Sequence, residues 1–149
     1  MKTNVGVVLD TIRAVEQRDV QALFALYHAD VELCDAPSLP YGGTRRGLGD
    51  IREALESDPE RTWLGTWEPL QPTEAERRMD PRVVAASDSE VVVLYRQRAL
   101  DSYGNRLDSP VLGLYEVREG KFARAQMFHF DTVAVIEFLA GLGHRSGGV

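Results

Sequence analysis

The stretch LYHADVELCDAPSLPYGGTRRGLGDIREAL, at residues 26–55, decides the fold because three elements follow one another within it. Residues 30–35 alternate between apolar and polar side chains, which predicts a short strand. Prolines and glycines in residues 37–43 then predict turns, and apolar residues return at helical spacing over residues 48–55. The strand therefore brings Asp35 to the edge of a loop, where partial burial of a carboxylate raises its pKa.

Three helices are predicted in the first half of the chain. Their apolar residues recur at helical spacing, over residues 5–15, 20–27 and 48–57. Thr3 or Asn4 can cap the first helix, and Asp19 can cap the second. Residues 62–70 are predicted to form a strand, and the polar, proline-punctuated residues 69–81 are predicted to form a loop.

The second half of the chain is predicted to form an antiparallel sheet. Four segments rich in Val, Leu, Tyr and Phe are separated by short connections typical of hairpins, and they cover residues 82–86, 90–100, 107–118 and 121–130. Asp131 then opens a short helix over residues 132–139. Helices followed by a meander of strands predict an α+β fold. We expect one domain over residues 1–143 and a flexible tail over residues 144–149.

Composition argues against several classes of function. The 149 residues carry a formal net charge of −6, which disfavours binding to nucleic acids or to anionic membranes. One cysteine, Cys34, allows no intrachain disulfide. No apolar run approaches the roughly 20 residues of a membrane span, and no signal peptide is recognisable, so we expect a cytoplasmic protein. The histidines lack metal-binding spacing and no nucleotide-binding motif is present, so we expect neither a metal nor a cofactor.

Two motifs make the chain similar to a known superfamily. The first is Asp35 ahead of a proline-containing loop and a helix that opens with Gly47-x-x-x-Ile51-Arg52. The second is Gly120-Lys121-Phe122, followed by FHFDT at residues 128–132 and an apolar helix. This order resembles the nuclear transport factor 2-like superfamily of ketosteroid isomerases, SnoaL-like polyketide cyclases and scytalone dehydratases, and its end resembles the SnoaL-like branch.

The resemblance implies a particular form of the α+β fold. A curved, mostly antiparallel sheet is expected to wrap around the three N-terminal helices as a cone, the cystatin-like roll, with a short C-terminal helix. Residues 1–143 would then be one SnoaL-like domain with a pocket at the open end of the cone.

Three residues are candidates for catalysis. By the resemblance Asp35 is the general base; the alternative is a turn aspartate that accepts backbone N–H groups near residues 36–38. His129 and Asp131 lie two apart on a strand and share a face with Met127. If that face lines the pocket, the two residues would form an acid/base pair. The resemblance supports this interpretation, because SnoaL-like cyclases use an aspartate late in the chain together with a histidine. Alternatively, Asp131 caps a helix and His129 faces outward.

The chain departs from two members of the superfamily. Ketosteroid isomerases carry oxyanion donors on the first helix, where this chain has Thr11, and on the penultimate strand, where residues 111–114 read VLGL. Limonene epoxide hydrolases use Arg-x-Asp where this chain has RQR at residues 96–98. Steroid isomerisation and the epoxide hydrolase relay are therefore not expected.

Aromatic side chains and a methionine are predicted to line a ligand pocket. Those predicted to bind the substrate are Tyr41, Trp63, Trp67, Tyr95, Tyr115 and Met127. We expect a homodimer that acts on a small hydrophobic or polycyclic molecule by cofactor-independent acid/base chemistry, such as polyketide-cyclase-like cyclisation, isomerisation or dehydration in secondary metabolism. The alternatives are a non-catalytic ligand-binding protein of the same fold and a scaffold that only dimerises, with a filled cone.

Overall fold

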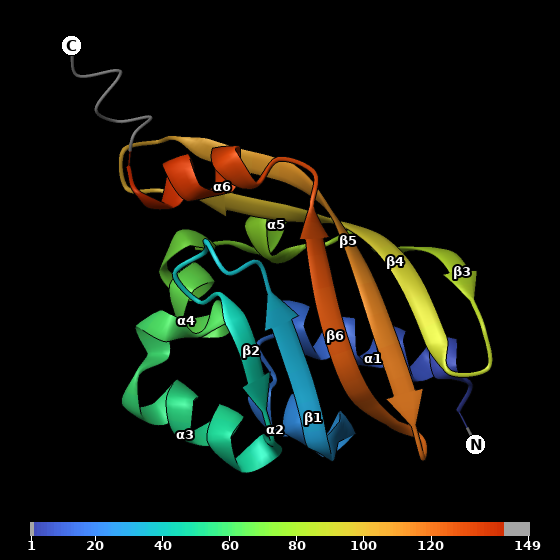
Figure 1. The fold of residues 1–149 in the computed structure, drawn as a ribbon. Helices are drawn as coiled ribbons and strands as arrows, with labels where there is room; N and C mark the ends of the chain where they lie inside the picture. The colour runs from blue at the N-terminus through green and yellow to red at the C-terminus, as the bar shows by residue number, and fades with distance from the viewer. Residues whose placement is uncertain (1, 142–149) are drawn as a thin grey trace.

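The computed structural model describes residues 2–141 and shows the predicted α+β fold (Figure 1). One curved, open sheet has the strand order β2-β1-β6-β5-β4-β3. Its strands are β1 Tyr27–Asp35, β2 Gly43–Arg46, β3 Arg82–Ala86, β4 Glu90–Leu100, β5 Arg106–Arg118 and β6 Lys121–His129. The predicted tail, residues 144–149, lies outside the described residues. No helix within residues 2–141 is long and apolar enough to cross a membrane.

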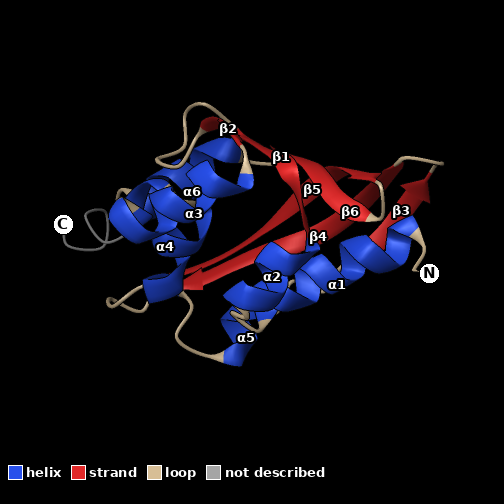
Figure 2. Cartoon of the chain, turned by 90° about the horizontal axis from the view of Figure 1, so that it is seen from below, coloured by secondary structure: helices blue, strands red, loops and turns tan. Residues whose placement is uncertain are grey.

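Helices cover one face of this sheet (Figure 2). They are α1 Asn4–Glu16, α2 Val20–Leu26, α3 Leu48–Ser57, α4 Trp63–Trp67, α5 Glu74–Arg77 and α6 Thr132–Leu139, with short 3₁₀ turns η1 Pro59–Arg61 and η2 Glu68–Leu70. β1 pairs in parallel with β6, and the other neighbouring strands are antiparallel. Register shifts in three of the strand pairs bend the sheet, so that it curves around α1 and α2.

The first two helices begin at the predicted caps. The Thr3 hydroxyl accepts a hydrogen bond from the Gly6 N–H at 3.0 Å, and Asp19 accepts one from the Ala22 N–H at 3.0 Å. Each bond satisfies a backbone donor that has no partner inside its helix. The second helix ends at Leu26, one residue earlier than predicted, and Tyr27 begins β1.

The strand predicted over residues 62–70 is wrong, because these residues form α4 and η2. Thr62 starts the helix by accepting a hydrogen bond from the Gly65 N–H at 3.0 Å. Gly65 lets this turn pack against Pro59, whose carbonyl oxygen would lie 2.0 Å from a Cβ at position 65. Trp63 and Trp67 are thus one helical turn apart and face the same way. A strand here would need a neighbouring strand with which to form backbone hydrogen bonds, and this segment has none among the described residues.

The loop between β1 and β2 is closed by backbone hydrogen bonds. The Leu39 N–H donates to the Ala36 carbonyl oxygen at 3.0 Å, and the Gly42 N–H donates to the Leu39 carbonyl oxygen at 2.9 Å. The chain then returns as β2, a strand the sequence analysis did not predict, and Gly43 pairs with Asp35. This reversal of the chain direction places β2 beside β1.

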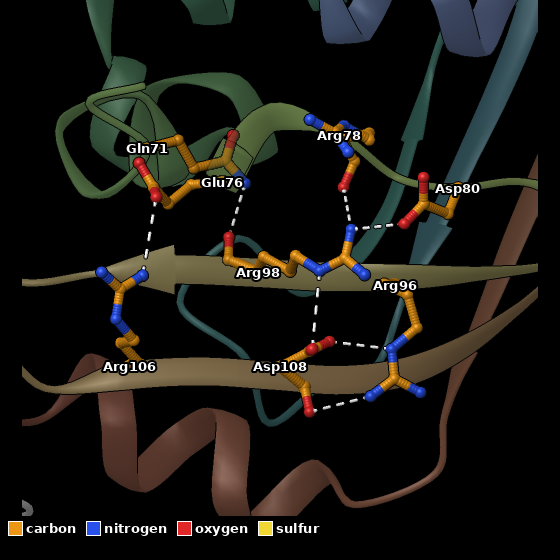
Figure 3. Close-up of polar contacts among 8 residues, drawn as sticks. All are labelled: Gln71, Glu76, Arg78, Asp80, Arg96, Arg98, Arg106 and Asp108. Carbon is orange, nitrogen blue, oxygen red and sulfur yellow. Dashed lines mark hydrogen bonds and ion pairs between the residues drawn. The ribbon is translucent and has the colours of Figure 1, made fainter. Parts of the chain in front are cut away.

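A polar network ties residues 71–80 to β4 and β5 (Figure 3). Arg98 lies at its centre. Its guanidinium donates to the Arg78 carbonyl oxygen at 2.9 Å and to Asp80 at 2.8 Å. Its Nε also lies 3.5 Å from a carboxylate oxygen of Asp108. The predicted loop, which contains the single turn α5, is therefore held in one place.

Two clusters of buried apolar side chains leave space between them. The first lies between α1 and the sheet and includes Val8, Val93 and Val111. The second lies where α4 and α6 meet the end of the sheet, and it includes Trp67 and Val135. The cavity described below lies at the junction of α1, α2, α3 and α4 with the concave face of the sheet.

Replacing Gly42 with alanine should test how tightly this loop is built. A Cβ there would lie 2.2 Å from the Ala36 carbonyl oxygen and 2.8 Å from the Leu39 carbonyl oxygen, so the loop would have to move. We expect the free energy of unfolding to fall by more than about 1 kcal/mol in urea denaturation. Gly49→Ala is the matched control because open space surrounds that position, and it should be neutral or stabilising by up to about 1 kcal/mol. Equal effects of the two changes would contradict the tight loop.

Candidate active site

A cavity of about 280 Å³ lies between the helices and the concave face of the sheet. Most of its wall is apolar or aromatic, and the few polar side chains include Thr11, Asp35, Arg45, Arg61 and Thr62. Its volume is near the lower end of the range for small-molecule sites, roughly 300–1,000 Å³. Such a wall can bind a compact hydrophobic molecule and present a few polar groups to it.

Asp35 is the carboxylate on this wall. It is the last residue of β1, and its inner oxygen, Oδ1, is buried without a hydrogen-bond partner among residues 2–141. Burial raises the pKa of Asp35 to about 7, although the positive charge of Arg45 acts in the opposite direction. The side chain can therefore gain or lose a proton near neutral pH, as a general base must.

The turn-aspartate alternative finds no support in this geometry. In that alternative the Asp35 carboxylate would accept N–H groups of residues 36–38. The turns are closed instead by backbone carbonyl oxygens of Ala36 and Leu39, and no side-chain hydrogen bond of Asp35 is present within the described part of the chain. The carboxyl is thus left available to a ligand.

Four tyrosines lie around this carboxyl, three of them buried and Tyr27 half-buried. Burial raises the pKa of each phenol, and the charge of Asp35 raises each further. They line the cavity from four different elements and are Tyr27, Tyr41, Tyr95 and Tyr115. These phenols remain protonated at neutral pH and can donate hydrogen bonds.

Two of these phenols act as a pair. The hydroxyls of Tyr95 on β4 and Tyr115 on β5 share a hydrogen bond. The Tyr115 ring lies over Gly113, where a Cβ would be 2.3 Å from the phenol oxygen. Whichever phenol accepts the shared bond keeps its own hydroxyl hydrogen for a ligand in the cavity.

The structure places five of the six predicted binding residues on the cavity wall, and Trp67 is the exception. Trp67 is completely buried behind Tyr41, and its indole N–H donates to the Tyr41 hydroxyl oxygen at 3.1 Å. Its ring lies in the second core cluster. Trp67 therefore supports Tyr41 and does not line the cavity.

His129 and Asp131 are not on the wall of the cavity that Asp35 lines. The Nδ1 atom of His129 is buried without a hydrogen-bond partner among the described residues, and burial lowers the pKa of its imidazole. Asp131 caps α6, because its carboxylate accepts the Ala134 N–H at 3.0 Å. The structure thus confirms the capping interpretation of Asp131 and does not bring these two residues to Asp35. Their catalytic role stays a prediction.

Several wall residues escaped the sequence analysis. The apolar spacing predicts Tyr27 at the end of a helix, but it belongs to β1. The sequence predicts no strand at residues 43–46, where Arg45 lies on β2. Residues 44–46 read Thr-Arg-Arg and show no apolar–polar alternation. Arg45 is placed on the inner face by its pairing with Leu33 of β1. No three His, Cys, Asp or Glu side chains come together as a metal site within residues 2–141.

The pKa of Asp35 predicts an unusual dependence of stability on pH. The native state keeps the Asp35 proton up to about pH 7, but the unfolded chain releases it near its ordinary value of 3.8. Stability should therefore fall as the pH rises from about 4 to 7, because the native state binds more protons over that interval. Asp35→Asn should raise the free energy of unfolding by up to about 4 kcal/mol at pH 8 and change it little at pH 4.

Urea denaturation at the two pH values measures this difference. Asp30→Asn, at an exposed position of the same strand, removes the same charge and serves as the control. A loss of stability at pH 8 in the Asp35→Asn protein would show that the carboxylate has a structural partner.

Comparison with known proteins agrees with this architecture. TerC co-crystallised with polyporic acid superposes with a TM-score of 0.72 at 24% identity, covering 92% of this chain and 98% of TerC. An NTF2-like protein from Burkholderia pseudomallei gives 0.69 at 18% identity, covering 91% and 98%. A candidate polyketide cyclase from Xanthomonas campestris gives 0.66 at 18% identity, covering 91% and 95%. No curated protein matches the chain.

These likenesses show the nuclear transport factor 2-like fold. The sequence itself is matched over residues 8–125 by the model of the SnoaL-like domain. The chain therefore belongs to the SnoaL-like domain family.

Proposed function

We propose that this protein is a small-molecule enzyme in which Asp35 performs acid/base chemistry without a cofactor. The observation that carries the proposal is the Asp35 carboxyl, which is buried on the wall of an apolar cavity with no hydrogen-bond partner for Oδ1 among the described residues. Holding a carboxyl in this state costs stability, and such costs are typical of functional sites.

In the proposed reaction, Asp35 takes a proton from a carbon next to a carbonyl group of the substrate. The electron pair of the broken C–H bond moves to the carbonyl oxygen and forms an enolate. A phenol of the Tyr95–Tyr115 pair donates a hydrogen bond to that oxygen. Where the substrate carries a C=C bond beside the deprotonated carbon, the enolate is a dienolate; protonated Asp35 then returns its proton to the far carbon of that bond, and the double bond moves into conjugation with the carbonyl, which isomerises the substrate. If the enolate instead attacks a second carbonyl carbon, a C–C bond forms, the electron pair of that C=O bond moves to its oxygen, and protonated Asp35 gives its proton to the resulting alkoxide, which completes a cyclisation.

The comparisons support a broad substrate class, that of small hydrophobic molecules. The family is that of SnoaL-like domains, and proteins of similar fold include a candidate polyketide cyclase and TerC, which was crystallised with polyporic acid. These are consistent with a small hydrophobic ligand, and we propose that this chain acts in secondary metabolism. Isomerisation, cyclisation and dehydration all need a base at this position.

A non-catalytic ligand-binding protein is the second candidate. One observation favours it: His129, which was predicted to form an acid/base pair with Asp131 in the pocket, is not on the cavity wall. In that case the phenols would hold a ligand carbonyl oxygen, and Asp35 would accept a hydrogen bond from a ligand hydroxyl. Binding would then occur without turnover.

We also propose that two copies associate through the sheet face opposite the helices. Leu112 and Phe128 are cross-strand neighbours there and are 37% and 48% exposed. Phe130 follows with 85% exposure. Replacing Phe128 with glutamate should convert a dimer into a monomer in sedimentation equilibrium, because a charge buried in an apolar interface is strongly unfavourable. A wild-type monomer at micromolar concentrations would contradict this proposal.

Proton abstraction can be measured before the natural substrate is known. The probe is 2-tetralone, a two-ring ketone whose C–H groups next to the carbonyl exchange slowly with deuterium oxide, followed by NMR at about pH 8. We expect the wild-type protein to catalyse exchange, Asp35→Asn to be slower by about 100-fold or more, and Tyr115→Phe by at least about 10-fold. Asp30→Asn should match the wild type.

Calorimetric titration with the same ketone separates the two candidate functions. If the ketone binds equally to the wild type and to Asp35→Asn and neither catalyses exchange, the protein is a ligand-binding protein. A His129→Gln variant tests the remaining prediction, and a loss of exchange activity there would return His129 to the catalytic site.

A further inference from the structure

Arg45 is a second charged group on the wall that Asp35 lines. Its partner across the β1–β2 ladder is Leu33, which also lines the cavity, and Gly43 is the partner of Asp35. Arg45 is therefore on the inner face, one diagonal step from Asp35, a separation of roughly 7–8 Å between neighbouring strands. The strand thus carries a cation and a carboxyl to the same cavity.

The Arg45 guanidinium is held by a hydrogen bond but makes no ion pair with any residue that the structure describes. One of its nitrogens, Nη2, donates to the Arg61 carbonyl oxygen at 2.8 Å. Within residues 2–141 its neighbours on this edge are paired: Arg46 with Glu32 at 3.2 Å, and Arg61 with Asp58 at 3.5 Å. Arg45 has no such carboxylate, and most of its five N–H donors remain available.

An arginine held in this way is suited to an anionic oxygen group. A half-buried guanidinium forms short, often paired hydrogen bonds to a carboxylate, and these are stronger where water is partly excluded. The rest of the wall near Arg45 offers apolar side chains such as Leu33, Ile51 and Leu55. A ligand that satisfies both features is an apolar ring system with one acidic substituent.

We propose that Arg45 binds a carboxylate on the substrate, so that the substrate class is a hydrophobic, ring-containing carboxylic acid. This inference rests on the proposed function for its substrate, but it concerns binding and can fail independently of catalysis. The carboxylate would fix the ligand at the β2 edge of the cavity. The remainder of the ligand would then extend past Asp35 toward the Tyr95–Tyr115 pair.

Two probes of equal size test the proposal. 2-Naphthoate carries a carboxylate and 2-naphthamide a neutral amide on the same ring system, and calorimetric titration at pH 6 gives their affinities. We expect the wild-type protein to bind the naphthoate at least about 10-fold more tightly than the amide. Arg45→Gln should weaken naphthoate binding by about 10-fold or more and leave amide binding within about two-fold.

The control variant is Arg46→Gln, which removes the same charge from the next residue of β2. Its side chain is on the opposite face of the strand, 76% exposed and paired with Glu32. We expect it to keep the naphthoate preference. Equal losses in the two arginine variants would show a general effect of net charge and overturn the proposal, as would equal affinities of the two probes, or no naphthoate binding, in the wild type.

One further variant separates this proposal from the proposed function. Asp35→Asn should lose exchange of 2-tetralone yet retain the naphthoate preference, because Arg45 is unchanged in it. If Arg45→Gln keeps the naphthoate preference while Asp35→Asn abolishes exchange, the proposed function stands and the carboxylate site is refuted. If Asp35→Asn catalyses exchange as fast as the wild type and the naphthoate preference still depends on Arg45, the proposed function is refuted and the carboxylate site stands.

Discussion

An ionised carboxylate that leaves water for an apolar cavity loses much of its hydration, and Asp35 has no hydrogen bond among the described residues that would offset this loss. The carboxyl stays in this position because the backbone on both sides of it is fixed. β1 pairs with β2 and β6, and the loop after it is closed by its own carbonyl oxygens. The raised pKa, the protonated phenols and the stability cost all follow from that placement.

The surrounding structure limits relaxation of the site. The two core clusters support its opposite sides, and Trp67 fixes Tyr41 by a hydrogen bond from a completely buried indole. The polar network around Arg98 holds the chain beside Met79, which lines the cavity. A preorganised wall of this kind can stabilise developing charge without rearranging at the moment of reaction.

The hydrogen-bond donors on the cavity wall lie at other positions of the fold than the oxyanion donors of the ketosteroid isomerases, which the sequence resembles. Thr11 lies where the isomerases carry an oxyanion donor on the first helix, but its hydroxyl donates to the Val7 carbonyl oxygen at 2.8 Å. It is therefore not available to a ligand as a donor. On the penultimate strand, Gly113 lies in the segment where the isomerases carry their second oxyanion donor. The absence of a side chain at Gly113 leaves room for the Tyr115 ring. Under the proposed function, the phenols of β4 and β5 would supply the donors that the isomerases take from other positions.

Local patterns were enough to predict most of the elements. The α+β class, the first three helices, the meander of strands and the position of Asp35 at the end of β1 follow from apolar periodicity, caps and turn residues, which act over a few neighbours. The helix at residues 63–67 was not predicted, because two tryptophans four residues apart are compatible with either period. Its capping by Thr62 and its packing against Pro59 depend on contacts that the periodicity does not contain.

The composition of the cavity wall was decided by tertiary structure. Tyr27 and Arg45 belong to it because β1 starts earlier than predicted and β2 folds back beside it, and strand pairing is a contact between distant segments. His129 follows Met127 on β6, but only Met127 reaches the wall, since the cavity ends before His129. The sequence by itself determined which residues were available for chemistry. The curvature of the sheet and the register of its strands decided which of them meet, because a side chain's neighbours across a sheet depend on pairing that no local pattern specifies.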